Sequence, residues 1–436
     1  MDLAKTYDFK EAILTQHAQG IGNTRTSFSS KIESRKAKAL ENFQRWGFPT
    51  TKHEEYKYFN LSKVLKNQYI LPSESSPTQK DLKSPLFDEL EANRLVFVNG
   101  QYAPEHSKLV SSGNELIISP LQEADQAIVE KYFGQEAYSS NDPFVELNTA
   151  FAGPGVFIHV PKNKVVRHPV IIHFISDADK GNIFVQPRVL LVAETNARVT
   201  LLETFHTIGS HISFTNAVTE VVLHTDAVVN YYKLQNDKSS SVHVGATIVT
   251  QEGKSTFNSA TITLNGMMVR NNLNVIMRAE YSEAHFYGLY FTGDRQVVDN
   301  HTMVDHAVPH CESNELYKGI LDDHSTGVFN GKIFVKQDAQ KTNAFQSNKN
   351  ILLTRDATMN TKPQLEIFAD DVKCSHGATI GQLEEEPLFY LRSRGIDEDS
   401  ARALLLVAFA QDIIDHVTID LLQEYLSKAI EQRLSN

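Results

Sequence analysis

Four short polar turns recur at nearly equal intervals through the middle of the chain. They are Glu194–Ala197, His224–Ala227, Gln251–Lys254 and Ala279–Ser282, and their first residues are 30, 27 and 28 positions apart. Short runs rich in β-branched residues, which favour strands, lie between them. A repeat of this length built from strands is typical of a solenoid, in which each coil supports its neighbours. The recurrence therefore predicts stacked β-coils from about residue 155 to residue 373.

A β-sandwich is the alternative architecture, because it also contains many short strands. The hairpins of a sandwich should bring frequent Asn-Gly or Asp-Gly turns, and these are scarce here. We therefore favour the coils and keep the sandwich as the second interpretation. The strand-like runs are Val170–Ile175, Val189–Val192, Val218–Leu223, Ala246–Thr250 and Ser259–Leu264.

The residues before this region are expected to be mostly helical. Apolar residues at mixed three- and four-residue spacing predict helices over Phe9–Gln19, Ser30–Trp46 and Leu121–Phe133. Gly47 and Pro49 should end the second of these helices. The exceptions are a strand, Arg94–Val98, with a tight turn at Asn99-Gly100, and a polar linker at Pro72–Pro77.

The C-terminal tail is also expected to be helical, from just after Gly377. Pro387 suits the first turn of a helix, and Gly395 suits its end. Asp397 should cap the next helix. Apolar stripes run through Leu404, Leu405, Ala408, Phe409 and Ile413, and through Leu422, Tyr425, Leu426 and Ile430. We therefore expect three domains: residues 1–150, a mixed and mostly helical domain; residues 151–375, the β-coil core; and residues 376–436, a helical domain.

Composition narrows the classes of function. The formal net charge of −11 argues against a general nucleic-acid or anionic-membrane binder, since both need clustered positive charge. The first residues lack the pattern of a secretory signal, and no apolar run approaches the roughly 20 residues that span a bilayer. Two cysteines cannot form a disulfide framework. We expect a cytoplasmic protein that binds neither nucleic acid nor membrane.

Cys374 and His376 are the candidate metal-ligating pair. In an extended backbone, residues i and i+2 project from the same face about 6–7 Å apart. A thiol and an imidazole side by side are good ligands for iron and other borderline metals. The pair lies where the β-rich region ends and the helical tail begins.

A second group contains His301, His306, His310 and Cys311, and we interpret it as structural. In a strand, residues 301 and 306 fall on opposite faces because their separation is odd.

Nucleotide-binding and common hydrolase motifs are absent: the chain has no G-x-x-x-x-G-K-[ST], H-E-x-x-H or G-x-S-x-G sequence. The chain itself should therefore not be an ATPase.

Several motifs resemble the SufB/SufD family of iron–sulfur cluster assembly proteins, and its SufD branch in particular. They are PTTKHEEYKY at 49–58, DDVKCSHGAT at 370–379, GQLEEEPLFYLRSRGI at 381–396 and ARALLLVAF at 401–409. The resemblance brackets most of the chain. It implies a mainly β fold, a right-handed parallel β-helix, between the N-terminal domain and the C-terminal helical domain.

The resemblance also implies a non-catalytic scaffold that pairs with SufB and docks the SufC ATPase on its C-terminal helices. His376, with Cys374 as an accessory, would contribute ligands to a transient iron–sulfur cluster at the SufB interface. The expected SufC contacts are Phe389, Tyr390, Arg392, Arg394 and Gly395. No cofactor is expected to stay tightly bound to the chain alone, which could form a homodimer in isolation.

Two alternatives remain at this point. A SufB-type paralogue would carry an acceptor cysteine 25–30 residues upstream of the motif histidine, but the comparable stretch Asn348–Leu353 has none. Gly377 also stands where SufB-type sequences have glutamate. A β-helix polysaccharide lyase or hydrolase is the alternative from another class, and such enzymes are usually secreted and line a groove with acids.

Overall fold

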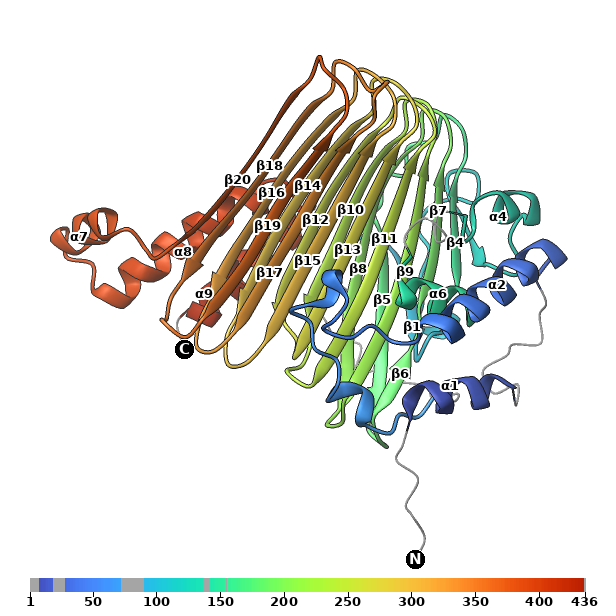
Figure 1. Cartoon of the computed structure of the whole chain (residues 1–436), viewed down its shortest axis with the longest axis horizontal. Coiled ribbons are helices and arrows are strands. Elements are labelled where there is room, and N and C mark those ends of the chain that lie inside the picture. The colour runs from blue at the N-terminus through green and yellow to red at the C-terminus, as the bar shows by residue number, and fades with distance from the viewer. Residues whose placement is uncertain (1–7, 19–27, 72–89, 136–140, 154, 435–436) are drawn as a thin grey trace, which may run out of the picture.

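The computed structural model describes residues 8–18, 28–71, 90–135, 141–153 and 155–434. Two 10-stranded sheets face each other and form a parallel β-solenoid (Figure 1). From β7 onward, consecutive strands alternate between the sheets, so each coil contributes one strand to each sheet. The parallel β-helix expected from the turn recurrence and from the family resemblance is confirmed, and the sandwich is excluded.

The first sheet, called sheet A, ends in β19. Its strands in spatial order are β19 (Thr358–Ile367), β17 (Thr326–Val335), β15 (Val297–His306), β13 (Met268–Met277), β11 (Ser241–Gln251), β9 (Ser213–Leu223), β7 (Arg188–Ala193), β4 (Val156–Val160) and β3 (Ile117–Pro120), with β6 (Ile183–Val185) also paired to β9.

The second sheet, called sheet B, ends in β20. Its strands in spatial order are β2 (Gln101–Tyr102), β1 (Asn93–Val98), β5 (Val170–Ala178), β8 (Arg198–Gly209), β10 (Val228–Asn236), β12 (Thr256–Asn265), β14 (Glu283–Thr292), β16 (Glu312–Leu321), β18 (Asn343–Leu352) and β20 (Lys373–Gly381).

The corners of the coils explain the recurrent turns. All four predicted turns lie between consecutive strands of the two sheets, with Gln251 as the last residue of β11. One residue in a left-handed conformation marks most of these corners, a backbone state that Asn and Asp adopt more readily than other non-glycine residues. Their φ angles lie between 57° and 62°, at Asn196, Asp226, Tyr281, His310 and Lys341.

The space between the sheets holds the main hydrophobic core. Side chains alternate along each strand, so that in β15 Val298, Val304 and His306 are buried while Val297 and Met303 are partly exposed. The inward residues of successive coils stack into a continuous core that includes Leu201, Tyr231, Phe257 and Phe286. This stacking makes each coil depend on its neighbours.

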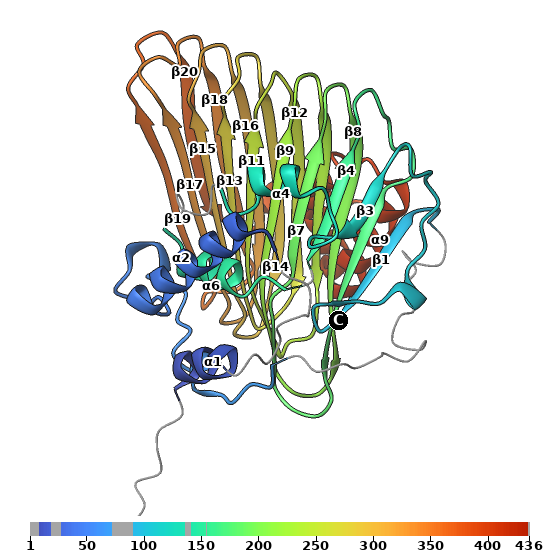
Figure 2. The same cartoon turned by 90° about the vertical axis from the view of Figure 1, so that its right-hand side faces the viewer.

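The N-terminal helices cover the outer face of sheet A (Figures 1 and 2). Phe9, Phe43 and Tyr56 pack with Phe184 and Phe214 of the sheet. The helical elements of this part are α1 (Phe9–Ala18), α2 (Ser30–Trp46), α4 (Gln126–Tyr132), α6 (Pro143–Ala150) and the 3-10 turns η1 (Glu54–Tyr56), η2 (Val64–Lys66) and η4 (Pro104–His106).

The predicted N-terminal helices are present at the expected positions, but one of them is shorter than predicted. The helix α2 has the predicted bounds, and the Gly47 amide closes it by bonding to the Phe43 carbonyl. The predicted helix over 121–133 is shorter, because the side chain of Asp125 caps α4 and residues 121–124 form a turn. The predicted strand at 94–98 is β1, which pairs with β5, and Asn99 and Gly100 form the turn into β2. The predicted linker at 72–77 lies outside the described residues.

The C-terminal helices α8 (Glu398–Ile414) and α9 (Asp420–Leu434) lie on the outer face of sheet B. Leu406, Ile413, Leu422 and Leu426 pack against sheet residues such as Ile262. The helix α7 (Glu385–Ser393) stands apart from the sheets, beyond α8 (Figure 1). The expectation of helix from just after Gly377 is wrong at its start, because β20 pairs with β18 as far as Gly381.

The two ends of the solenoid differ. At the N-terminal end, β2 and β3 pair antiparallel to β1 and β4 and close the two sheets. At the other end, within the described part of the chain, β19 pairs only with β17 and β20 only with β18. Pro363 fits such an edge, because proline is confined to edge strands and bulges. The last coil therefore leaves its outer strand edges open.

Candidate functional site

The predicted metal-ligating pair lies on β20, the last strand of sheet B. Cys374 is in register with Ala344 and His376 with Gln346, and both neighbours are buried in the solenoid interior. Because register neighbours share a face, Cys374 and His376 both face inward over the open end. The extended backbone that places them side by side is confirmed.

The two side chains have different surroundings. Cys374 is partly buried against a small apolar cluster that includes Val335 and Ala344. Burial raises the pKa of its thiol, so the thiol is protonated at neutral pH. A metal that binds the sulfur must therefore displace a proton. His376 is exposed at the open end.

The described residues contain no group of three or more His, Cys, Asp or Glu side chains arranged to hold a metal ion. Cys374 and His376 place a thiol and an imidazole, two side chains of the types that bind iron, on one edge strand.

A row of polar side chains leads from this pair into the interior. Glu315 of β16, Gln346 of β18 and His376 of β20 are in register on three successive coils of sheet B. Gln346 donates a hydrogen bond from Nε2 to the Glu315 carboxylate over 2.7 Å. Glu315 and Gln346 belong to no motif that marked them as candidate site residues in the sequence. Glu315 lies 31 positions before Gln346, and Gln346 lies 30 positions before His376. These spacings repeat the length of one coil, so counting back from His376 by one coil at a time would have identified both residues.

Three large apolar side chains on the last strands and corner of the solenoid are exposed. Phe345 on β18, Phe368 after β19 and Ile380 on β20 are all large and exposed, with Phe368 60% exposed. Large exposed apolar groups that gather beside unpaired strand edges mark interaction surfaces in soluble proteins. The open end is thus suited to contact with another chain.

The predicted SufC-contact residues lie on α7 and the turn after it. Phe389 is 74% exposed and Tyr390 is 56% exposed. The guanidinium of Arg394 lies 5.3 Å from the Tyr390 ring centroid, and Arg392 pairs with Glu398 at 3.2 Å. Gly395 has a φ of 90°, which favours glycine. The structure brings these residues together on one projecting element.

The second histidine group is dispersed. His301 and His306 point to opposite faces of β15, as predicted from their odd separation. His306 is buried, bonds to Ser313, and has its pKa lowered to about 4 by burial. His310 occupies a coil corner, and burial raises the pKa of the Cys311 thiol. The group does not form one site.

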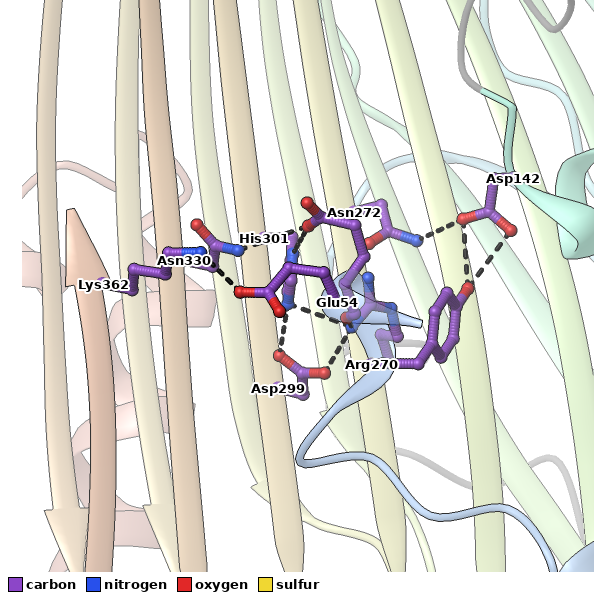
Figure 3. Close-up of polar contacts among 10 residues, drawn as sticks. Glu54, Asp142, Arg270, Asn272, Asp299, His301, Asn330 and Lys362 are labelled. Carbon is purple, nitrogen blue, oxygen red and sulfur yellow. Dashed lines mark hydrogen bonds and ion pairs between the residues drawn. The ribbon is translucent and has the colours of Figure 1, made fainter. Parts of the chain in front are cut away.

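The PTTKHEEYKY motif, residues 49–58, crosses the outer face of sheet A, and we call it the N-terminal strap. Figure 3 shows its polar contacts. Lys362 of β19 donates to Glu54 over 2.8 Å, and Asn330 of β17 donates to Glu55 over 3.2 Å. The strap thereby connects the N-terminal domain to the last strands of sheet A.

Buried charge fixes the centre of the strap (Figure 3). Arg270 is buried, pairs with Asp299, and donates to the Glu55 carbonyl over 2.7 Å. Its guanidinium lies 4.0 Å from the Tyr56 ring centroid. His301 bonds to Glu55 at 3.1 Å, and this contact is the largest cause that lowers the pKa of Glu55. A cavity of about 640 Å³ remains between the strap and the sheet.

Comparisons with known proteins agree with this architecture. Residues 174–409 match the family model described as SUF system FeS cluster assembly, SufBD core domain, and residues 11–172 match the SufBD protein N-terminal region. No helix in the described parts of the chain has the length and apolar character needed to cross a membrane.

Individual relatives span nearly the whole chain. An iron–sulfur cluster assembly SufBD family protein of Synechocystis is 34% identical over 396 residues, which cover 88% of this chain and 87% of the relative. The iron–sulfur cluster assembly protein SufD of Escherichia coli is 32% identical over 404 residues, 91% of each chain. SufD of Bacillus subtilis is 26% identical over 435 residues, 94% of this chain and 96% of the relative.

These matches confirm the resemblance to SufD that the motifs indicated and leave the polysaccharide lyase alternative without support. Two family models cover the chain almost end to end, and two of the named relatives exceed 30% identity over most of both chains. The chain belongs to the SufBD family of iron–sulfur cluster assembly proteins.

Proposed function

We propose that this chain is a SufD-type, non-catalytic scaffold subunit that pairs with a SufB-type subunit through the open end of its solenoid. The observation that carries the proposal is the position of Cys374 and His376 on β20, the edge strand at that end. An unpaired strand edge offers backbone donors and acceptors to a second β-protein. Exposed Phe345, Phe368 and Ile380 add apolar area beside it.

In this assembly, Cys374 and His376 contribute ligands to a transient iron–sulfur cluster at the boundary between the subunits. Iron in such clusters is held by thiolate, and by imidazole in some centres. A site divided between two chains opens when the chains separate, so the cluster can leave as readily as it forms. The partner supplies the ligands that this chain lacks.

The SufC ATPase docks, in this proposal, on helix α7 and the turn that follows it. Phe389 and Tyr390 supply exposed aromatic area, and Arg394 adds a charge that stacks on Tyr390. Aromatic and arginine side chains are the types that dominate binding energy at protein interfaces. The two free cysteines suit the reducing cytoplasm, where we place the complex.

Co-expression of the tagged chain with SufB and SufC of the same organism tests this proposal. We expect a stable complex that contains both partners, with a mass that gives the subunit ratio. Recovery of the chain as a homodimer or monomer without SufB would contradict the proposed pairing. Recovery of SufB without SufC would contradict only the docking role of α7.

A further inference from the structure

The row Glu315, Gln346 and His376 continues the proposed cluster site into the solenoid. These residues occupy equivalent inward positions on β16, β18 and β20. Adjacent parallel strands lie about 4.8 Å apart, so inward side chains on successive coils are direct neighbours. Gln346 is only 3% exposed although it is polar, and Glu315 behind it is 7% exposed.

The hydrogen bond to Glu315 fixes which way the Gln346 amide points. Nε2 donates to Glu315 Oε2 over 2.7 Å, a bond that a carboxyl oxygen accepts whether or not the group carries a proton, so the nitrogen of the amide faces Glu315. The amide oxygen Oε1 then faces away from Glu315. Oε1 is buried, and within the described residues it has no hydrogen-bond partner. A buried acceptor without a donor costs free energy of folding, so a donor at this oxygen would stabilise the site.

Sheet A makes room for this amide. Gly331 of β17 lies across the interior from Gln346, and a Cβ atom at position 331 would lie 1.9 Å from Nε2 and 2.6 Å from Cδ. A side chain at position 331 would therefore force the amide or its neighbours to shift. The amide therefore lies between Glu315, to which it donates, and the backbone of Gly331.

His376 is the register neighbour of Gln346 on the next coil, and its imidazole can carry an N–H donor. Its inward position is one coil beyond Gln346, and exposed side chains exchange rotamers on a fast time scale. We propose that Gln346 is a positioning residue for His376, whose imidazole N–H donates to Oε1, with Glu315 holding the amide in the required orientation. This inference rests on the proposed function of His376 as a ligand.

A hydrogen bond from His376 to Gln346 would prepare the imidazole for metal binding. An imidazole that binds a metal presents an unprotonated nitrogen and usually donates its other N–H to a neighbouring acceptor, which fixes the tautomer. Gln346 supplies such an acceptor without a charge of its own. His376 is thereby oriented before the partner chain and the iron arrive.

The 15N chemical shifts of the His376 ring in the full chain test the contact, since they report the tautomer and hydrogen bonding. The signal is identified by its loss in His376→Ala. The test variant is Gln346→Met, which keeps the length of the side chain and removes the acceptor. The matched control is Gln235→Met, because Gln235 is a buried glutamine on β10, far from β20 along sheet B.

Gln346→Met should change the His376 ring shifts, and Gln235→Met should not. In cells that depend on this chain, Gln346→Met should lower the activity of an iron–sulfur enzyme such as aconitase roughly tenfold, the size typical of losing a partner of a metal ligand. Glu315→Gln should give intermediate changes, because the new amide no longer dictates the orientation of Gln346. This second variant serves if Gln346→Met fails to fold.

The outcomes separate this inference from the proposed function. Unchanged ring shifts in both Gln346→Met and Glu315→Gln would overturn the inference, even if His376→Ala abolished delivery and so supported the ligand role. Wild-type delivery by His376→Ala would remove the ligand role and the inference with it. Equal shift changes in Gln235→Met and Gln346→Met would show a general structural effect and would also overturn it.

Discussion

Glu315 is a buried carboxyl group inside the solenoid. In its hydrogen bond with Gln346, the donor is a neutral amide and not a cation. Burial raises its pKa from 4.5 to about 7. The folded protein therefore holds a proton on Glu315 at pH values where the unfolded chain has released it. A carboxyl group whose pKa is raised by folding contributes fully to the free energy of unfolding below pH 4.5. That contribution is lost as the pH rises through 7.

Glu315→Gln should remove this part of the pH dependence. Between pH 5 and pH 8, the free energy of unfolding of the wild type should fall relative to that of the variant, by at most about 3 kcal/mol for a shift of this size. Urea unfolding of both proteins across this range measures the difference. Parallel curves for the two proteins would show that Glu315 keeps an ordinary pKa in the fold.

Gly331→Ala tests the tight contact with Gln346. The added Cβ would lie 1.9 Å from the amide nitrogen, so the strands or the amide must shift. We expect the free energy of unfolding to fall by about 1–3 kcal/mol, as for other overpacked interiors. The control is Gly377→Ala on β20, where a Cβ meets nothing within 4 Å. Equal stability of the two variants would contradict the placement of the amide.

At the scale of elements, the sequence predicts much of the solenoid, because one turn per coil repeats along the chain. The corners at Asn196 and Asp226 and the bounds of α2 follow from local patterns. The contact of Glu55 with His301 does not, because it joins residues 246 positions apart through the tertiary fold. The inward position of Gln346 also depends on the pairing of β18 with β16 and β20, which no local pattern specifies.

Phe389 and Phe368, two of the exposed aromatic residues, should serve different partners, because they lie on different elements. Phe389 lies on α7, and Phe368 lies just after β19 at the open end. Phe389→Ala combined with Arg394→Glu should weaken co-purification of SufC at least tenfold and leave SufB bound. Phe368→Ala should weaken SufB and leave the contact with SufC. Both changes are at exposed positions, so thermal stability should stay near that of the wild type.

The same loss of both partners in either variant would indicate one shared surface. Unchanged co-purification in both would move the interfaces elsewhere. The direction of each effect follows from the different elements that carry the two residues, α7 and the corner after β19, so each variant serves as the control for the other.

At the scale of the whole molecule, the solenoid is closed at one end and open at the other. The antiparallel strands β2 and β3 close the N-terminal end, and helices cover the outer faces of both sheets near their middle. Repeat proteins need such closure at both ends to remain soluble, unless a partner covers the open coil. Cys374 and His376 lie on that open coil. In the proposed function, the contact with the partner subunit and the binding of the cluster therefore occur at the same end of the solenoid.

Hydrogen–deuterium exchange of the chain, with and without its SufB-type partner, tests this account most directly. If the open end is the subunit interface, backbone amides of residues 373–381 should exchange at least tenfold more slowly in the complex, while those of β1–β3 keep their rates. Protection that falls on β1–β3, or a complex that forms without slowing exchange at 373–381, would contradict the account.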